Sequence, residues 1–165
     1  MKKNNYISLI IEKYEIQNNY PRCINCFYNN TFAQNVKGTN KNMPIGVFDS
    51  GTGGLTVLEA MLSLDAYNNN TGLPGADGKP DFSSEFFEYL ADQANMPYGN
   101  YAAEKKTDLL KEHIFKNMQF LLQSNNAKQS AKMIVLACNT ATAYALSDIK
   151  AKFKAENIQV PVIGV

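Results

Sequence analysis

Short apolar runs recur along the chain from Ile45 onward, and polar, glycine-bearing segments separate them. The runs occupy residues 45–48, 86–91, 133–137 and 160–165. Runs of this length, rich in branched and aromatic residues, are typical of strands that are buried on both faces of a parallel sheet. We therefore predict four strands at these positions.

Three of the segments between these runs carry apolar residues at helical spacing. We predict helices over residues 55–65, 102–123 and 140–156. The apolar positions that define them are Leu55, Leu58 and Leu62, then Leu110, Ile114, Met118, Leu121 and Leu122, then Ala145, Leu146, Ile149 and Phe153. Strands that alternate with helices imply parallel pairing through right-handed crossovers. The predicted fold class is α/β, a parallel sheet with flanking helices.

Two segments fall outside this alternation. Residues 68–81 hold three glycines and two prolines, which predicts an exposed loop. Residues 1–42 show no sustained period and carry six Lys/Arg against two Asp/Glu, whereas residues 43–165 carry ten against thirteen. We interpret residues 1–42 as a leader of uncertain structure, either disordered or upstream of a natural start at Met43. Residues 43–165 would then form one α/β domain.

Composition narrows the class of protein. The chain has 165 residues, of which 45% are hydrophobic and 19% charged, with a formal net charge of +1. These values are ordinary for a soluble globular domain and favour neither a nucleic-acid partner nor a polybasic membrane surface. No apolar stretch approaches the roughly 18–20 residues of a membrane helix. We expect a cytoplasmic protein.

The chain has three cysteines, Cys23, Cys26 and Cys138. An odd and small number does not indicate a disulfide framework. The pair Cys23 and Cys26 forms a C-x-x-C, but a zinc site would need two more ligands, and only Cys138 and His113 are available. No strand pattern precedes the pair, as a redox motif would require. We predict no metal site.

Polar residues follow three of the predicted strands, at the segments 49–54, 97–99 and 138–140. Ligands of open parallel sheets bind at the carboxyl ends of the strands, so these loops are the candidate site. The glycine-rich turn 49–54 matches neither the phosphate-loop pattern nor G-x-G-x-x-G. Dinucleotide binding is therefore disfavoured.

Cys138 stands between a predicted strand and a predicted helix. Cysteines at helix starts can act as bases or nucleophiles, although a buried inert cysteine is the commoner case. Asn139 and Thr140 are good N-cap residues, and together with backbone N–H groups they could also hold a carboxylate. Asp49 could orient either Cys138 or the ammonium group of a substrate. These alternatives stay open at this level.

Three motifs in order carry a resemblance to a known family. They are IGVFDSGTGGL at 45–55, YLAD at 89–92 running into MPYG at 96–99, and ACNTA at 137–141. Over residues 43–165 the chain resembles the N-terminal portion of glutamate racemases of the aspartate/glutamate racemase superfamily. The resemblance implies a fold of two similar α/β domains with the site between them.

The resemblance also implies roles for particular residues. Cys138 matches the first of two catalytic cysteines. The positions implied to contact the substrate glutamate are Asp49, Ser50, Pro97, Tyr98, Gly99, Asn139 and Thr140. The family uses neither pyridoxal phosphate nor a metal, so no cofactor is expected, and it makes D-glutamate for peptidoglycan.

The chain departs from the family pattern in one respect that bears on activity. The second cysteine, in a Gly-Cys-Thr-His motif, has no counterpart after Cys138. A carbanion intermediate has two faces, and one thiol reaches only one of them. We therefore expect a truncated racemase that is nearly inactive alone. An aspartate or other amino-acid racemase, a non-catalytic amino-acid-binding fragment, and a homodimer of the full-length parent stay open.

Overall fold

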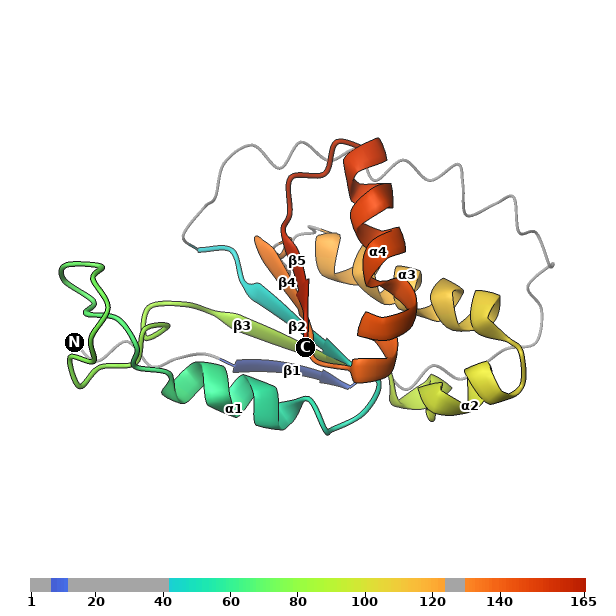
Figure 1. Ribbon diagram of the computed structural model, residues 1–165, viewed down its shortest axis with the longest axis horizontal. Helices are drawn as coiled ribbons and strands as arrows, with labels where there is room; N and C mark the ends of the chain where they lie inside the picture. Colours follow the sequence, from blue (N-terminus) through green and yellow to red (C-terminus); the bar gives the residue numbers. More distant parts are fainter. Residues whose placement is uncertain (1–6, 12–41, 124–129) are drawn as a thin grey trace.

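A parallel sheet forms the centre of the computed structural model, which describes residues 7–11, 42–123 and 130–165. Its strand order is β1-β3-β2-β4-β5, with helices on both faces (Figure 1). The strands are β1 (Ile7–Ile11), β2 (Ile45–Asp49), β3 (Phe87–Ala91), β4 (Met133–Leu136) and β5 (Val162–Gly164). The helices are α1 (Leu55–Ser63), the short 3₁₀ helix η2 (Gln93–Asn95), α2 (Tyr98–Ala103), α3 (Thr107–Leu122) and α4 (Asn139–Ala155). The predicted α/β class with a parallel sheet is confirmed.

The register of the central strands is set by β2. It pairs in parallel with β3, with Asp49 opposite Ala91, and with β4, with Phe48 opposite Leu136. At the sheet's edge, β5 is shorter than the predicted run 160–165. It begins directly after Pro161, which has no N–H to donate to the ladder.

A fifth strand was not predicted. Residues Ile7–Ile11 pair in parallel with β3, from Ile7 opposite Phe87 to Ile11 opposite Ala91. The interpretation of 1–42 as a leader left its structure open, and this segment of it forms a strand of the sheet. Its apolar run is short, and its partner lies far along the chain, so local pattern does not predict the pairing. Cys23 and Cys26 lie outside the described residues.

The helix predicted over 102–123 is found as α3, but it begins five residues later than predicted. The chain forms α2 and then α3, and it turns between them at Lys105, whose φ of 56° is left-handed. The N–H of Lys106 donates to the carbonyl of Tyr101 across this turn, at 2.7 Å. Neither glycine nor proline occupies the turn, so the usual breaker signal is missing.

Two apolar clusters lie on opposite faces of the sheet. One face is covered by α2, α3 and α4, and the other by α1, as the separation of these helices in Figure 1 shows. The predicted stripe of α3 is buried throughout, at Leu110, Ile114, Met118, Leu121 and Leu122. Complete burial of such side chains contributes about 1.5–3 kcal/mol each. Packing on the sheet therefore fixes which face of α3 is turned inward.

The loop predicted over 68–81 is confirmed as an exposed excursion. It connects the end of α1 to the start of β3, and carboxylates hold it together. Asp65 accepts the N–H groups of Asp77 and Gly78, at 3.0 and 2.8 Å, and Asp81 accepts that of Ala66 at 2.9 Å. The loop therefore lies at the amino ends of the strands.

Ile114→Ala should destabilise the protein by about 2–4 kcal/mol, because the substitution removes buried methyl groups and leaves a cavity beneath α3. Urea unfolding followed by circular dichroism measures the change. Leu109→Ala, at an exposed position of the same helix, is the control and should change stability by about 0.5 kcal/mol or less. Equal effects of the two substitutions would contradict the assignment of the buried face.

The chain's one histidine gives a pH-dependent prediction. His113 packs edge-on against Tyr101, with ring centroids 5.6 Å apart, and its burial lowers its pKa below the ordinary value. The unfolded chain thus binds this proton at higher pH than the folded protein does. The free energy of unfolding should therefore fall as pH drops below about 6.5.

His113→Gln should remove this part of the pH dependence between pH 7 and 5. The measurement is the difference in unfolding free energy between the two proteins at each pH. Carboxylates titrate alike in both and cancel in the difference. A difference that stays constant over this range would show that burial does not perturb His113.

Candidate active site

The carboxyl ends of β2, β3 and β4 meet at one edge of the sheet. The N–H of Asp92 donates to the carbonyl of Asp49 at 3.0 Å, and the N–H of Ala137 donates to the carbonyl of Phe48 at 2.8 Å. These bonds extend the ladder beyond the strand ends. The loops after the three strands are therefore held side by side, as the sequence predicts for a site in a parallel sheet.

Cys138 is a free thiol directly after β4, and its side chain is 5% exposed. Its Sγ lies 3.5 Å from the Oγ of Ser50, and either atom could be the donor. The two residues are far apart in sequence and come from different strand ends. The structure thus brings together two of the residues that the sequence singles out.

The first turn of α4 adds backbone donors beside the thiol. Cys138 itself occupies the N-cap position, without a side-chain capping bond. The carbonyl of Cys138 accepts the first hydrogen bond of the helix, from the N–H of Thr142 at 2.9 Å. The N–H groups of Asn139 and Thr140 precede that donor, and such groups at a helix start attract anions. Asn139 and Thr140 are therefore the first residues of the helix rather than its N-cap.

Asp49 is buried and braces the glycine-rich turn. Its Oδ2 accepts the N–H of Gly54 at 2.8 Å and lies 3.4 Å from the hydroxyl of Tyr89. A Cβ on Gly54 would lie 2.8 Å from both Ala137 Cβ and Asp49 Cβ, so glycine allows the turn to approach β4. The carboxylate thus holds the loop that carries Ser50.

Tyr89 is a residue of this edge that the sequence analysis missed. Its hydroxyl donates to the carbonyl of Gly51 at 3.1 Å. Burial raises the pKa of Tyr89 well above its ordinary value, and the charge of Asp49 raises it further. The group stays a neutral phenol and braces the same turn. An aromatic residue in a strand gives no sequence signal for this role.

Tyr98 has a buried side chain, whereas its neighbours Pro97 and Gly99 are exposed. Its hydroxyl donates to Asp92 Oδ2 at 2.6 Å, and its ring lies 6.2 Å from that of Phe48. Burial raises the pKa of Tyr98, and the charge of Asp92 and its hydrogen bond to the phenol raise it further. The Tyr98 hydroxyl therefore bonds within the protein interior. The exposed surface of this segment is formed by Pro97 and Gly99.

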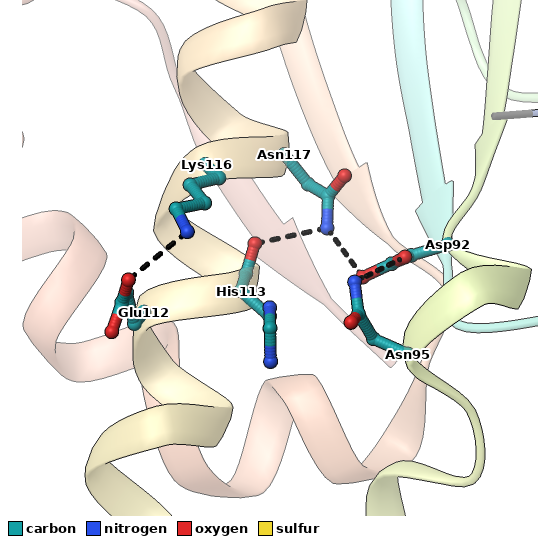
Figure 2. Close-up of polar contacts among 6 residues, drawn as sticks. All are labelled: Asp92, Asn95, Glu112, His113, Lys116 and Asn117. Atoms are coloured by element: carbon teal, nitrogen blue, oxygen red, sulfur yellow. Dashed lines mark hydrogen bonds and ion pairs between the residues drawn. The ribbon is translucent and has the colours of Figure 1, made fainter. Parts of the chain in front are cut away.

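Asp92 and two asparagines complete a buried polar network (Figure 2). The side-chain amide of Asn95 donates to Asp92 Oδ1 at 2.9 Å, and that of Asn117 donates to Asp92 Oδ2 at 3.0 Å. Asp92 belongs to a motif of the resemblance, but the sequence gives no sign that Asn117 of α3 reaches it. The three residues tie α3 to the loop after β3.

Other features lie away from this edge. A shallow hollow of about 390 Å³ is lined by Lys150, Phe153 and Val160 among others, at the end of α4. That is the opposite end of the helix from Cys138, so the hollow has no part in the thiol's chemistry. Within residues 7–11, 42–123 and 130–165, no group of three His, Cys, Asp or Glu could hold a metal ion. No helix in the same ranges is both long and apolar enough to cross a membrane.

This edge of the sheet can support proton transfer to or from a bound molecule that carries a carboxylate. A thiol can accept or donate a proton, and the adjacent hydroxyl of Ser50 can stabilise the charged form. Backbone N–H groups at the start of α4 can hold an anionic substrate group. The arrangement therefore suits the deprotonation of a small carboxylate-bearing molecule.

Comparison with known proteins gives a consistent set of relatives, although no family model matches the chain. The chain is 37% identical over 123 residues to a glutamate racemase of Halothermothrix orenii, and 40% identical over 122 residues to one of Thermus thermophilus. Each alignment covers 74% of this chain and 36% or 35% of the relative. The chain thus spans about a third of the length of the curated relatives it matches.

Solved structures agree with the sequence matches. The crystal structure of glutamate racemase from Thermus thermophilus in complex with beta-chloro-D-alanine superposes with a TM-score of 0.52 at 36% identity, over 76% of this chain and 37% of that one. A glutamate racemase isoform from Bacillus anthracis gives a TM-score of 0.51 at 28% identity. The chain is therefore a homologue of the glutamate racemases, matching about a third of their length.

Proposed function

We propose that this chain provides one half of the catalytic site of a cofactor-independent glutamate racemase. The observation that carries the proposal is the free thiol of Cys138, 3.5 Å from the Ser50 hydroxyl and at the start of α4. Homology to glutamate racemases supports glutamate as the substrate. The proposed activity is that of the complete catalytic site. The alignment with this chain covers about a third of the relatives' length.

The proposed reaction transfers a proton through Cys138. The thiolate takes the α-hydrogen of glutamate as a proton, so the Cα–H bond breaks, an S–H bond forms, and the electron pair stays on the substrate next to its carboxylate. A second acid, on the opposite face, returns a proton to Cα. Cys138 serves one face only, so the proposed reaction needs a second group on the opposite face.

The residues around the thiol would bind and orient the substrate. The N–H groups and side chains of Asn139 and Thr140 would hold a carboxylate, and fixed donors of this kind stabilise charge that develops during the reaction. The exposed Pro97 and Gly99 would form the facing wall. Asp49 and Tyr98 would act indirectly, because their polar atoms bind neighbouring groups of the protein.

The finer parts of the proposal follow from the family. They are the supply of D-glutamate for peptidoglycan, a cytoplasmic location, and chemistry without pyridoxal phosphate or metal. They also include residues 43–165, whose sheet β1 extends, as one domain of a two-domain enzyme that assembles as a homodimer. An aspartate racemase and a non-catalytic binding protein are the outcomes that the following experiments separate from glutamate racemisation.

Glutamate should protect Cys138 from alkylation. In a Cys23→Ser/Cys26→Ser background, Cys138 is the remaining thiol of the chain. Saturating D- or L-glutamate should slow its reaction with iodoacetamide by about tenfold or more, because the bound substrate covers the sulfur. Mass spectrometry of the alkylated chain measures the rate.

The comparison ligand in that experiment is aspartate at the same concentration, with succinate as a control for carboxylates that lack the ammonium group. Stronger protection by aspartate would favour the aspartate racemase. Equal protection by all three would reveal a general anion site. An alkylation rate that no ligand changes would contradict the assignment of substrate contacts to this edge.

The chain should also exchange the α-hydrogen of one glutamate enantiomer in deuterium oxide. A thiol on one face removes the proton and returns deuterium to the same face, which leaves the configuration unchanged. Proton NMR of L- and D-glutamate measures the loss of the α-hydrogen signal. Cys138→Ser should lower the exchange rate by about 10²-fold or more.

The control for this experiment is the Cys23→Ser/Cys26→Ser protein, which should exchange as fast as the parent chain. Protection from alkylation without any exchange would favour the binding protein over the enzyme. Exchange that survives Cys138→Ser would contradict the role of this thiol. Exchange of both enantiomers with inversion would show that a second base acts in the same chain.

A further inference from the structure

Asn117 is a buried polar residue of α3, and it has no role in the proposed chemistry. It lies on the inward face of α3, among the apolar residues that pack on the sheet. An asparagine costs stability there, since its amide must be satisfied away from water and its helix propensity is low. Its side chain reaches the loop after β3, the loop that leads into the candidate site (Figure 2).

The amide of Asn117 has two N–H donors and three acceptors within reach. Its Nδ2 lies 2.9 Å from the carbonyl of His113, 3.0 Å from Asp92 Oδ2 and 3.3 Å from the hydroxyl of Tyr98. The two shorter contacts use both N–H groups. One of them fixes the amide to its own helix, and the other is given to a buried carboxylate.

Asp92 links Asn117 to Tyr98, because one carboxylate oxygen accepts hydrogen bonds from both. The carboxylate is 3% exposed and accepts the Tyr98 hydroxyl at 2.6 Å on the same oxygen that accepts Asn117. Its side-chain donors are the neutral groups of Asn95, Asn117 and Tyr98, and hydrogen bonds to a buried carboxylate are among the stronger ones. Loss of the Asn117 donor would leave this buried carboxylate under-satisfied, so Asp92 would shift toward another donor or water and disturb its bond to Tyr98.

Tyr98 in turn anchors the exposed segment at the start of α2, a helix that contacts α4. It begins α2, its ring packs against Phe48 and Tyr101, and it belongs to the same apolar cluster as Cys138. Pro97 and Gly99 flank it on the surface. Any shift of the Tyr98 ring would move these two residues relative to Cys138.

We propose that Asn117 is a positioning residue that acts through Asp92 and Tyr98 to hold the segment Pro97–Gly99 at the distance from Cys138 that glutamate requires. The inference rests on the proposed function and extends it to a residue that touches neither substrate nor thiol. It assigns to α3 a part in substrate affinity as well as in core packing.

The test compares Asn117→Leu with Gln119→Leu, a matched amide-to-leucine change two residues along α3. Hydrogen exchange followed by mass spectrometry should show faster exchange for peptides covering 97–104 in Asn117→Leu, while peptides of β4 and of the end of α3 keep their rates. The glutamate concentration that half-protects Cys138 from iodoacetamide should rise by about tenfold, the scale of one hydrogen bond to a charged group. Gln119→Leu should change neither measurement.

Tyr98→Phe removes only a hydroxyl, and it gives an independent test should Asn117→Leu fail to fold. It should weaken protection in the same direction. In the double variant the two effects should be clearly less than additive, because both act through Asp92. Full additivity would overturn the proposed path.

The remaining outcomes are also decisive. Faster local exchange with unchanged glutamate protection would leave Asn117 a purely structural residue and overturn the proposal. Unchanged exchange in peptides 97–104 would overturn it as well. If glutamate fails to protect Cys138 in the parent chain, the proposed function fails, and the exchange rates alone then decide whether Asn117 holds the segment.

Discussion

The parallel pairing of β2 with both β3 and β4 is the constraint on which the site depends. Asp49, Asp92 and Cys138 lie at the carboxyl ends of three strands, and backbone bonds from Asp92 to Asp49 and from Ala137 to Phe48 hold these ends level. A slip of one residue between β2 and β4 would turn the side chains of the slipped strand to the opposite face. Ser50 would then lose its contact with the thiol, so the register underlies the chemistry.

The polar groups at this edge fall into two sets with different tasks. Asp49, Tyr89, Asp92 and Tyr98 are buried, and their polar atoms bind one another or nearby backbone. Pro97, Gly99 and Asn139 are exposed, and Asn139 directly follows the buried Cys138. The buried set fixes the loops, because an unpaired buried polar atom would be costly. The exposed set is what a ligand could meet, which is why a motif residue such as Tyr98 can matter without touching a substrate.

Much of the fold and the membership of the site could be predicted from local pattern. Apolar runs gave β2 to β5 nearly at their bounds, and helical spacing gave the buried stripe of α3. The pairing of Ile7–Ile11 with β3 and the break at Lys105 could not be predicted. The first depends on a partner distant in sequence, and the second occurs where no glycine or proline marks a turn.

The sequence by itself determined that polar residues follow successive buried strands, and hence that Ser50, Tyr98 and Cys138 would gather at one edge of a parallel sheet. Only the tertiary structure decided which of them face outward and which brace the loops. Strand period and loop composition are local, whereas the partner of a buried hydroxyl or amide is chosen by packing between distant segments. Asn117 illustrates this, because its amide finds its partner only when α3 packs against the loop that carries Asp92.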